Sequence, residues 1–372
     1  MRILMFSDYF YPLPLGGGER RMYEIAKRLA KKHEVHVIMR RLAGLASHEK
    51  HEGIYIHRVF VPSKGIALES PINGLFFIIA SFPKSLRLGN FDVYAPQQFF
   101  PLLPAWAASK VKRTPILATI HDVYSSGWIQ RYGLRGRLMA LFEQITLRLP
   151  YTKVTTVSNT SREKLVASRI PREKIEIIPN GVDLEMFDHV SIEKSGRPRI
   201  IYVGRLIGYK HVDDLLVAFS RLDLDVELYI VGEGPERKNL EALAKKLKVD
   251  HNVTFTGFVD ERKKIELLKS SHVLVLPSST EGFGIAVIEA WASRSAVIVS
   301  DIPALHELAE EGKAGLLFKL GDIEDLGAKL KQVLKDKSLQ SKLSQNGYDL
   351  VREKFAWDKV AGEVEKTFRG IA

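Results

Sequence analysis

At 372 residues, with 45% hydrophobic and 27% charged side chains, the chain is longer than one ordinary domain and has the composition of a folded globular protein. Because it contains no cysteine, disulfides, thiolate metal ligands and thiol nucleophiles are excluded. The net charge is +11, which either a solvated basic surface or an anionic partner would explain.

The first half alternates short apolar segments with longer amphipathic ones, a pattern typical of parallel strands joined by crossover helices. An apolar i, i+3, i+4, i+7 pattern from Met22 to Leu29 predicts a helix after the first strand. No signal peptide is visible, and the longest apolar run, Leu75 to Phe82, is far shorter than the roughly 18 residues of a spanning helix. We therefore expect a cytoplasmic protein that does not cross a membrane. The expected strands are Ile3–Ser7, Val35–Met39, Ile54–Phe60, Ile116–Ile120, Val154–Val157 and Ile175–Ile178.

The second half repeats this alternation after a polar, irregular stretch that ends with Ser195–Gly196–Arg197–Pro198. Open α/β sheets bind ligands beyond the carboxyl ends of their strands, so we expect an α/β protein whose two Rossmann-like domains face each other across a cleft. The predicted domains are residues 1–183 and 199–354, with a linker over 184–198. The expected strands of this half are Ile200–Val203, Leu228–Val231, Val253–Thr256, Val273–Leu276 and Val297–Ser300.

Two segments of the first half could contact an anionic or hydroxylated ligand. Gly16, Gly17 and Gly18 stand between the first strand and its helix, where amides can face an anion, although a glycine run is also typical of a plain turn. His121 follows the strand Ile116–Ile120 and could hydrogen-bond a sugar hydroxyl or stabilise developing charge. The alternative is a histidine that only ends a strand. Neither a GxGxxG nor a Walker A motif occurs.

The first strand of the second half leads into Gly204 and Arg205, and Lys210 follows five residues later. Two cations on one strand-end loop suit a diphosphate, because guanidinium binds two oxygens in a fork and ammonium acts as a point charge. A solvated basic loop is the alternative, and the acidic balance of the second half (28 basic against 31 acidic residues) favours the diphosphate. Phe258 lies in a later strand-end turn whose backbone could meet the edge of a base.

The most specific element is the segment Ser278–Glu289. Glu281 precedes an expected helix and Glu289 follows eight residues later, a spacing that rotates by roughly 80° along a helix, close enough for both carboxylates to face the same cleft. Carboxylates accept hydrogen bonds from vicinal hydroxyls, as an acidic residue does for a ribose in dinucleotide folds. A capping and a solvated glutamate are the alternative, but Glu289 lies among apolar residues. Four residues lie where the helix is expected to begin, so that their amides can meet a phosphate: Gly282, Phe283, Gly284 and Ile285.

Taken together, these segments resemble the family-4 (GT4) retaining glycosyltransferases of the GT-B fold, over nearly the whole chain and in the family's order. The resemblance rests on the glycine segment, on Asn180–Gly181–Val182–Asp183, on the Arg205 loop, and on Glu281 with Glu289, which match the family's E-x7-E signature. It implies an N-terminal acceptor domain, a C-terminal nucleotide-sugar-binding domain, and a last helix over 355–372 that crosses back to the N-terminal domain.

The resemblance also implies a reaction: front-face transfer of a hexosyl group, with retention, from a UDP- or GDP-sugar to an acceptor hydroxyl. No metal or other cofactor is expected, in keeping with the lack of a convincing metal-ligand cluster in the sequence. The chain departs from the family at Arg294, near a usual glycine and proline, and at His211, where a small residue is common. The implied catalytic residues are His121, Arg205, Lys210 and Glu281, and the implied donor-binding residues are Gly16, Gly17, Gly204, Phe258, Gly282, Phe283, Gly284, Ile285 and Glu289.

The acceptor is expected on the N-terminal domain, where residues 1–180 carry 27 basic against 13 acidic residues. The apolar, basic stretch Ile66–Arg87, helped by Lys110–Arg113, could dock on an anionic membrane surface, although an ordinary core helix is the alternative. The hypothesis is a lipid-linked or anionic glycan acceptor and an enzyme peripheral on the cytoplasmic membrane face. Nucleic acid is not expected, because no basic platform interleaved with aromatic residues occurs. The rival functions are a GT-B sugar-nucleotide epimerase and a non-catalytic sugar-nucleotide-binding protein.

Overall fold

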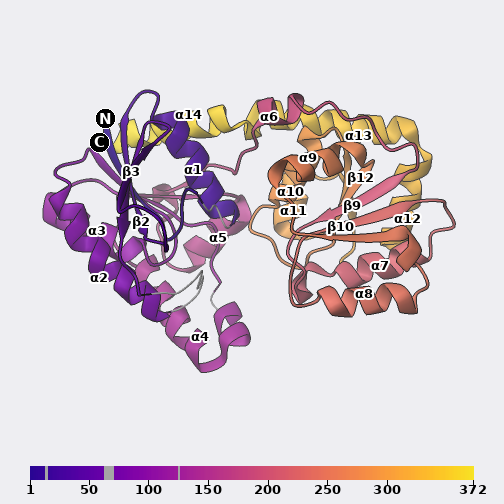
Figure 1. Ribbon diagram of the computed structural model, residues 1–372, viewed down its shortest axis with the longest axis horizontal. Coiled ribbons are helices and arrows are strands. Elements are labelled where there is room, and N and C mark those ends of the chain that lie inside the picture. Colours follow the sequence, from indigo (N-terminus) through magenta and orange to yellow (C-terminus); the bar gives the residue numbers. More distant parts are fainter. Residues whose placement is uncertain (13–15, 63–70, 125) are drawn as a thin grey trace. The chain divides into compact units, whose positions relative to one another are not determined.

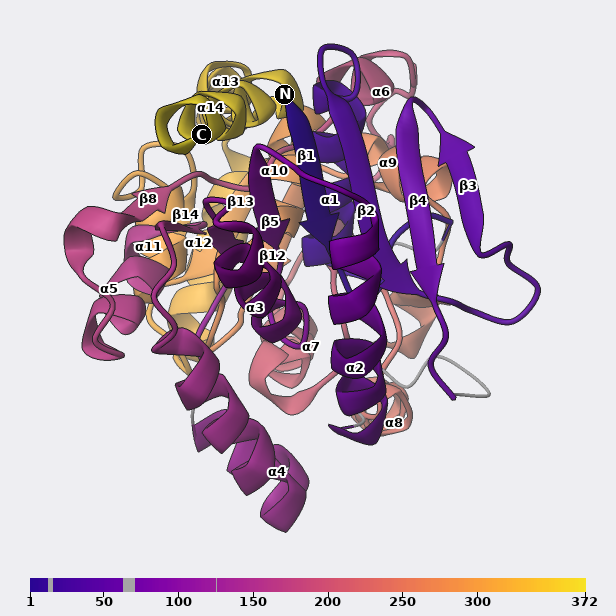
Figure 2. The ribbon, with the colours of Figure 1, turned by 90° about the vertical axis from the view of Figure 1, so that its left-hand side faces the viewer.

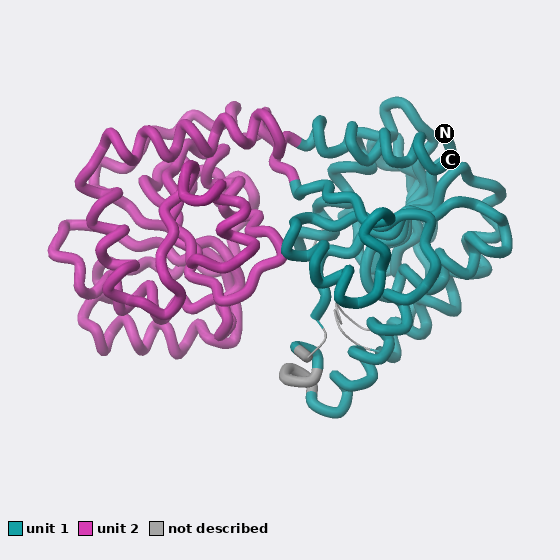
Figure 3. Tube along the Cα trace, turned by 180° about the vertical axis from the view of Figure 1, so that it is seen from behind, with its two compact units in different colours: residues 1–180, 357–372 teal, residues 181–356 magenta. Residues whose placement is uncertain are grey.

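The computed structural model describes residues 1–12, 16–62, 71–124 and 126–372, with the backbone alone at 126 and 129–132 (Figure 1). It divides into two compact units, which we call unit 1 (residues 1–180 and 357–372) and unit 2 (residues 181–356) (Figure 3). The chain therefore leaves unit 1 after Asn180 and returns to it at Trp357.

Unit 1 contains a five-stranded sheet in the order β3–β4–β2–β1–β5, parallel except that β3 pairs antiparallel with β4 (Figure 2). Three more parallel strands, β6 to β8, follow next to β5 and are joined to it by bridges at Tyr94–Ile116 and Gln97–Thr119. The strands are β1 (Arg2–Phe6), β2 (Glu34–Arg40), β3 (His48–His51), β4 (Ile54–Val59), β5 (Val93–Pro96), β6 (Leu117–Thr119), β7 (Lys153–Thr156) and β8 (Ile175–Ile177). The helices are α1 (Gly17–Leu29), α2 (Pro71–Arg87), α3 (Leu102–Lys112), α4 (Ser126–Leu147), α5 (Asn159–Ala167) and α14 (Trp357–Ile371).

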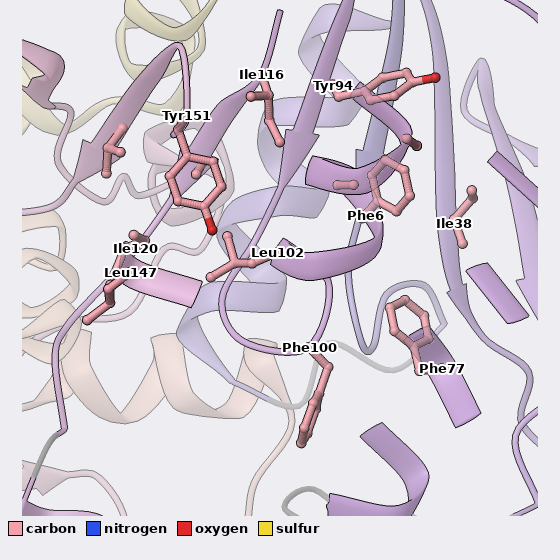
Figure 4. Packing of buried hydrophobic residues seen from close by; sticks show 14 of the residues in the cluster. Phe6, Ile38, Phe77, Tyr94, Phe100, Leu102, Ile116, Ile120, Leu147 and Tyr151 are labelled. Atoms are coloured by element: carbon pink, nitrogen blue, oxygen red, sulfur yellow. The ribbon is translucent and has the colours of Figure 1, made fainter. Parts of the chain in front are cut away.

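The core of unit 1 lies on both faces of this sheet, because side chains that alternate along β1 belong to two different clusters. Phe6 and neighbouring residues pack with Phe77 of α2 and Leu102 of α3 on one face (Figure 4). Ile3 and Met5 pack with side chains of α1 and α14 on the other face. The last helix of the chain is therefore part of the core of unit 1.

Unit 2 is built on a six-stranded parallel sheet in the order β11–β10–β9–β12–β13–β14. Its central strands read as unbroken apolar runs, as expected for a parallel sheet covered by helices on both faces. The strands are β9 (Arg199–Val203), β10 (Glu227–Val231), β11 (Val253–Gly257), β12 (Val273–Leu276), β13 (Ala296–Ser300) and β14 (Leu316–Phe318). The helices are α6 (Leu184–Asp188), α7 (Val212–Ser220), α8 (Arg237–Lys246), α9 (Glu261–Ser270), α10 (Ile285–Ala292), α11 (Pro303–Leu308), α12 (Ile323–Lys335) and α13 (Lys337–Leu350).

The prediction of an α/β protein with two Rossmann-like domains is confirmed, and each of the expected strands corresponds to an observed one. Three strands were not expected. β3 is polar throughout (His48–His51) because it lies at the edge of its sheet, β5 ends in a proline, and β14 has only three residues. The stretch expected to be an irregular linker begins with a helix, α6, whose first turn is capped by the Asp183 carboxylate.

Within the described residues, none of the helices combines the length and the apolar character that crossing a membrane requires. The segment Ile66–Arg87 falls partly outside the described residues, up to position 70, and its remainder forms α2.

Candidate functional site

In unit 2, the loops after β9 and β10 pack so closely that glycine is required between them. A Cβ on Gly232, whose φ is +134°, would lie 1.9 Å from the carbonyl oxygen of Gly204. The Tyr202 hydroxyl donates a hydrogen bond to the Arg205 carbonyl at 3.0 Å, which holds the loop after β9 in place. The Arg205 side chain is exposed and donates to the Tyr209 hydroxyl at 3.1 Å. The loop thus presents a guanidinium at the carboxyl edge of the sheet.

Lys210 and Glu281 form an ion pair at this same edge. The Lys210 Nζ lies 2.5 Å from Glu281 Oε1, and both side chains are nearly buried. The Ser278 hydroxyl donates to the same carboxylate oxygen at 2.8 Å, and the Ser279 amide donates to the Tyr209 carbonyl at 2.9 Å. The loops after β9 and β12 are therefore tied together, and they bring two predicted site residues into direct contact.

Helix α10 starts at this point with a left-handed residue. Gly284 has φ +97° at the N-cap position, and a Cβ there would also lie 2.8 Å from the Leu305 side chain. The Phe283 ring packs edge-on against Phe355, 5.6 Å between centroids. In the part of the chain that the structure describes, no side chain caps the first turn of α10. The amides from Ile285 onward and the helix dipole thus offer an anion site.

Glu289 lies on α10 and is buried, with 4% of its surface exposed. Its carboxylate accepts from Lys264 Nζ of α9 at 2.7 Å, and Lys264 also pairs with Glu261 at 3.1 Å. The rotation of about 80° that the spacing predicted between Glu281 and Glu289 does not apply, because α10 begins only after Glu281. Each glutamate instead has its own lysine. Lys264 was missed, because nothing in the sequence separates it from the other polar residues of α9.

Phe258 follows β11 at the outer edge of the unit 2 sheet, and its ring is 85% exposed. The turn begins at Gly257, whose φ of +73° suits glycine. A Cβ on Gly257 would lie 2.6 Å from the Glu233 carboxylate. The turn is thus held against the loop after β10, and it presents an aromatic face to solvent.

In unit 1, His121 packs against the start of α1. A Cβ on Gly18 would lie 3.1 Å from the His121 Nε2, and that nitrogen is buried with no hydrogen-bond partner among the described residues. The His121 amide donates to Gln98 Oε1 at 2.8 Å, which fixes its backbone. Gly16 and Gly17 are exposed, and the carboxylate of Glu19 accepts from the Gly16 amide. An anion at this helix start would therefore compete with Glu19.

The pKa of His121 is lowered to about 3, mainly by burial and in addition by the nearby Arg21 guanidinium. The ring is therefore neutral at physiological pH and acts there as a hydrogen-bonding group.

Acid is expected to destabilise the protein through His121. In the unfolded chain His121 takes up a proton as the pH falls below 6.5, the ordinary pKa of histidine, whereas in the folded chain it does so only near pH 3. The contribution of His121 to the free energy of unfolding is therefore complete above pH 6.5 and is lost between pH 6.5 and pH 3. Urea unfolding should show that the free energy of unfolding decreases less between pH 7 and pH 5 in His121→Gln than in the unchanged protein. His57, also lowered to about 3 by burial, leaves part of the dependence in place. An identical loss in both proteins would contradict the assignment.

One group of possible metal ligands occurs among the described residues: His211, Asp213 and Asp214 at the start of α7. Two aspartates in the first turn are also what the helix dipole favours. The His211 imidazole and the Asp214 carboxylate lie 3.4 Å apart. Stabilising the start of α7 is therefore an alternative role for the three residues.

Two family models match the chain. The model described as "Glycosyltransferase Family 4" matches residues 15–186, and the model described as "Glycosyl transferases group 1" matches residues 185–350. An uncharacterised glycosyltransferase of Methanocaldococcus jannaschii is 26% identical, covering 99% of this chain and 98% of its own. A phosphatidyl-myo-inositol mannosyltransferase of Mycobacterium leprae is 28% identical, covering 100% and 97%.

Solved structures share the fold over the whole chain. A sucrose-phosphate synthase from Thermosynechococcus elongatus superposes with a TM-score of 0.82 at 20% identity, covering 99% of this chain and 98% of its own. The Anabaena protein HepE, solved in complex with UDP and glucose, superposes with a TM-score of 0.77 at 18% identity, covering 100% of both chains.

Proposed function

Because this chain belongs to the family-4 glycosyltransferases of the GT-B fold, we propose that it moves a hexosyl group from a UDP- or GDP-sugar to an acceptor hydroxyl with retention of configuration. The observation that carries the proposal is the Lys210–Glu281 pair, beside Arg205 and next to the start of α10. In this proposal, the cations of this cluster bind the diphosphate and the Glu281 carboxylate binds the sugar attached to it.

The proposed roles follow from charge and hydrogen bonding. Arg205 and Lys210 bind the diphosphate, with the first amides of α10 facing its remaining oxygens. Glu281 accepts hydrogen bonds from sugar hydroxyls, and Glu289 accepts them from the ribose. As the glycosidic bond breaks, positive charge develops on the sugar and negative charge on the diphosphate. Stabilising that negative charge is the largest contribution that the protein makes to lowering the activation barrier.

The acceptor side of the proposal rests on unit 1. We place a lipid-linked or anionic glycan acceptor there, and we propose that His121 hydrogen-bonds a sugar hydroxyl and that the amides of Gly16 and Gly17 bind an anion. A neutral imidazole suits this position, because it can accept from a sugar hydroxyl without adding charge beside a forming cation. The leaving diphosphate takes the acceptor proton, so no further base and no metal are required.

A panel of UDP-, GDP- and ADP-sugars in a thermal-shift assay tests the donor. We expect a rise in Tm with UDP- or GDP-sugars that a chelator leaves unchanged, because a ligand that binds only the folded state raises its stability. If none of the sugar nucleotides raises Tm, the proposal is wrong. Product analysis without acceptor then separates a transferase from an epimerase, which would convert the donor sugar by itself.

Arg205→Ala is expected to weaken donor binding by about tenfold or more, since a charge-assisted bidentate contact to phosphate is lost. The side chain is exposed and contacts only Tyr209 among the described hydrogen bonds, so the fold should be unchanged. Calorimetric titration with the donor measures the effect. The matched control is Arg221→Ala, an exposed arginine of the same unit that pairs with Glu324. Equal affinities for the donor in the two variants would show that Arg205 does not bind it.

A further inference from the structure

Helix α4 exposes a row of large apolar side chains. Intervals of three and four residues place them along one side of the helix. They are Leu134, Leu138, Leu141 and Ile145, between 50% and 75% exposed. Helix α2 repeats the arrangement with Ile72, Leu75, Phe76 and Ile79, between 42% and 67% exposed. We call these eight side chains the apolar rows.

The packed sides of both helices are apolar as well. Met139 and Ala140 of α4 and Phe77 of α2 belong to the core of unit 1. A helix that is apolar on its packed and its outer side is normally covered on both, and exposed apolar surface of this extent marks an interaction site.

The two helices lie at the same end of unit 1 in both views (Figures 1 and 2). They are linked through Phe100. A Cβ on Gly74 of α2 would lie 2.2 Å from the Phe100 ring, and that ring lies 5.3 Å from the Phe142 ring of α4. The packed sides of α2 and α4 therefore meet around the Phe100 ring.

Among the described residues, the charges of α2 and α4 that are not buried have one sign. α2 contains no acidic residue, and the single acidic residue of α4, Glu143, is buried and accepts from the Tyr124 amide. The described basic residues on and just after these helices are Lys84, Arg87, Arg135, Arg137 and Arg148.

We propose that α4, together with α2, docks unit 1 on an anionic lipid surface. The apolar rows enter the boundary between headgroups and acyl chains, and the arginines contact lipid phosphates. This goes beyond sugar transfer, because transfer to a free glycan needs no such surface. It also adds α4, which the sequence did not single out, to the membrane hypothesis for residues 66–87.

A second copy of the chain fits this surface less well. In a twofold interface the same patch meets itself, so the arginines beside the apolar rows would face arginines across the interface. A sheet of lipid phosphates instead supplies the opposite charge along the whole surface.

Cosedimentation of the full chain with vesicles tests the proposal. We expect binding to vesicles that contain phosphatidylglycerol, little binding to vesicles of phosphatidylcholine alone, and loss of binding at high salt. Leu138→Ser with Leu141→Ser should lower the partition coefficient about tenfold or more, because two apolar side chains no longer enter the acyl boundary. Arg135→Gln with Arg137→Gln should lower it by about tenfold for anionic vesicles alone.

The matched control is Met186→Ser with Ile192→Ser, two exposed apolar residues of unit 2, which should bind vesicles as the unchanged protein does. All variants replace exposed side chains, so urea midpoints should stay the same and report any loss of folding. The proposal is overturned if the unchanged protein fails to bind anionic vesicles at low salt, or if the α4 leucine variant binds as well as the control. It is also overturned if light scattering shows a dimer that the α4 substitutions dissociate.

Discussion

Lys210→Met is expected to lower kcat by about 100- to 1000-fold, the size of effect seen when one preorganised charge is removed from a developing anion. In the proposed reaction the ammonium faces a diphosphate whose negative charge grows as the glycosidic bond breaks. The substitution removes that charge and keeps the length of the side chain. The rate of nucleoside diphosphate release, measured with the donor that the thermal-shift panel identifies, reports the effect.

Lys210 has two roles in this proposal: it pairs with Glu281 in the fold and it stabilises the diphosphate during the reaction. The substitution takes the ammonium away from Glu281, which keeps its hydrogen bond from Ser278, so some stability is lost with it. Lys210→Arg should recover part of kcat, because it restores a cation. Lys246→Met, an exposed lysine on α8, is the control and should leave the rate unchanged. A rise in KM at constant kcat would mean that Lys210 only binds the ground state, contrary to the proposal.

Trp291→Ala should lower the free energy of unfolding by about 3–5 kcal/mol, as expected for truncating a fully buried tryptophan. The indole Nε1 donates to the Ala314 carbonyl at 3.0 Å. The ring also fills the space beside Gly347 of α13, where a Cβ would lie 2.1 Å from it. The substitution therefore leaves both a cavity and a carbonyl without its donor. Urea denaturation followed by circular dichroism measures the change.

Trp291→Phe is the control, because it keeps most of the ring volume and loses the hydrogen bond. It should destabilise unit 2 less than the alanine variant does. The prediction fails if the alanine variant loses less than about 1 kcal/mol, the ordinary effect of a point substitution. Because Trp291 shares α10 with Glu289, donor binding in the alanine variant also reports how firmly the helix holds that carboxylate.

Among the strands that the sequence predicted, Val273–Leu276 is an unbroken apolar run, because burial on both faces of the sheet leaves a clear pattern. The strand His48–His51 has no such pattern, since it lies at the edge of its sheet and pairs on one side only. Position in the sheet is set by pairing with distant residues, which a local pattern does not contain.

Some contacts of the candidate site also arise from pairing between distant residues. The pairing of Lys210 with Glu281 joins residues 71 positions apart, and the motif on either side indicates only an anion site. Lys264 carries no local signal, because its role arises from the packing of α9 against α10. The exposed row of α4 could not be read either, since a helix apolar on both sides has no periodicity that tells the packed side from the outer one.

The return of the chain to unit 1 has a consequence for biosynthesis. Trp357, Val360, Val364 and Phe368 of α14 pack in the same cluster as Ile3 and the apolar side of α1, so this core combines segments that are translated before and after unit 2. Unit 2, residues 181–356, is continuous in the chain and can complete its sheet during translation. Unit 1 must wait for α14, and the part of this face that α14 packs on stays uncovered until then. A nascent chain stalled before residue 357 should therefore recruit chaperones through unit 1.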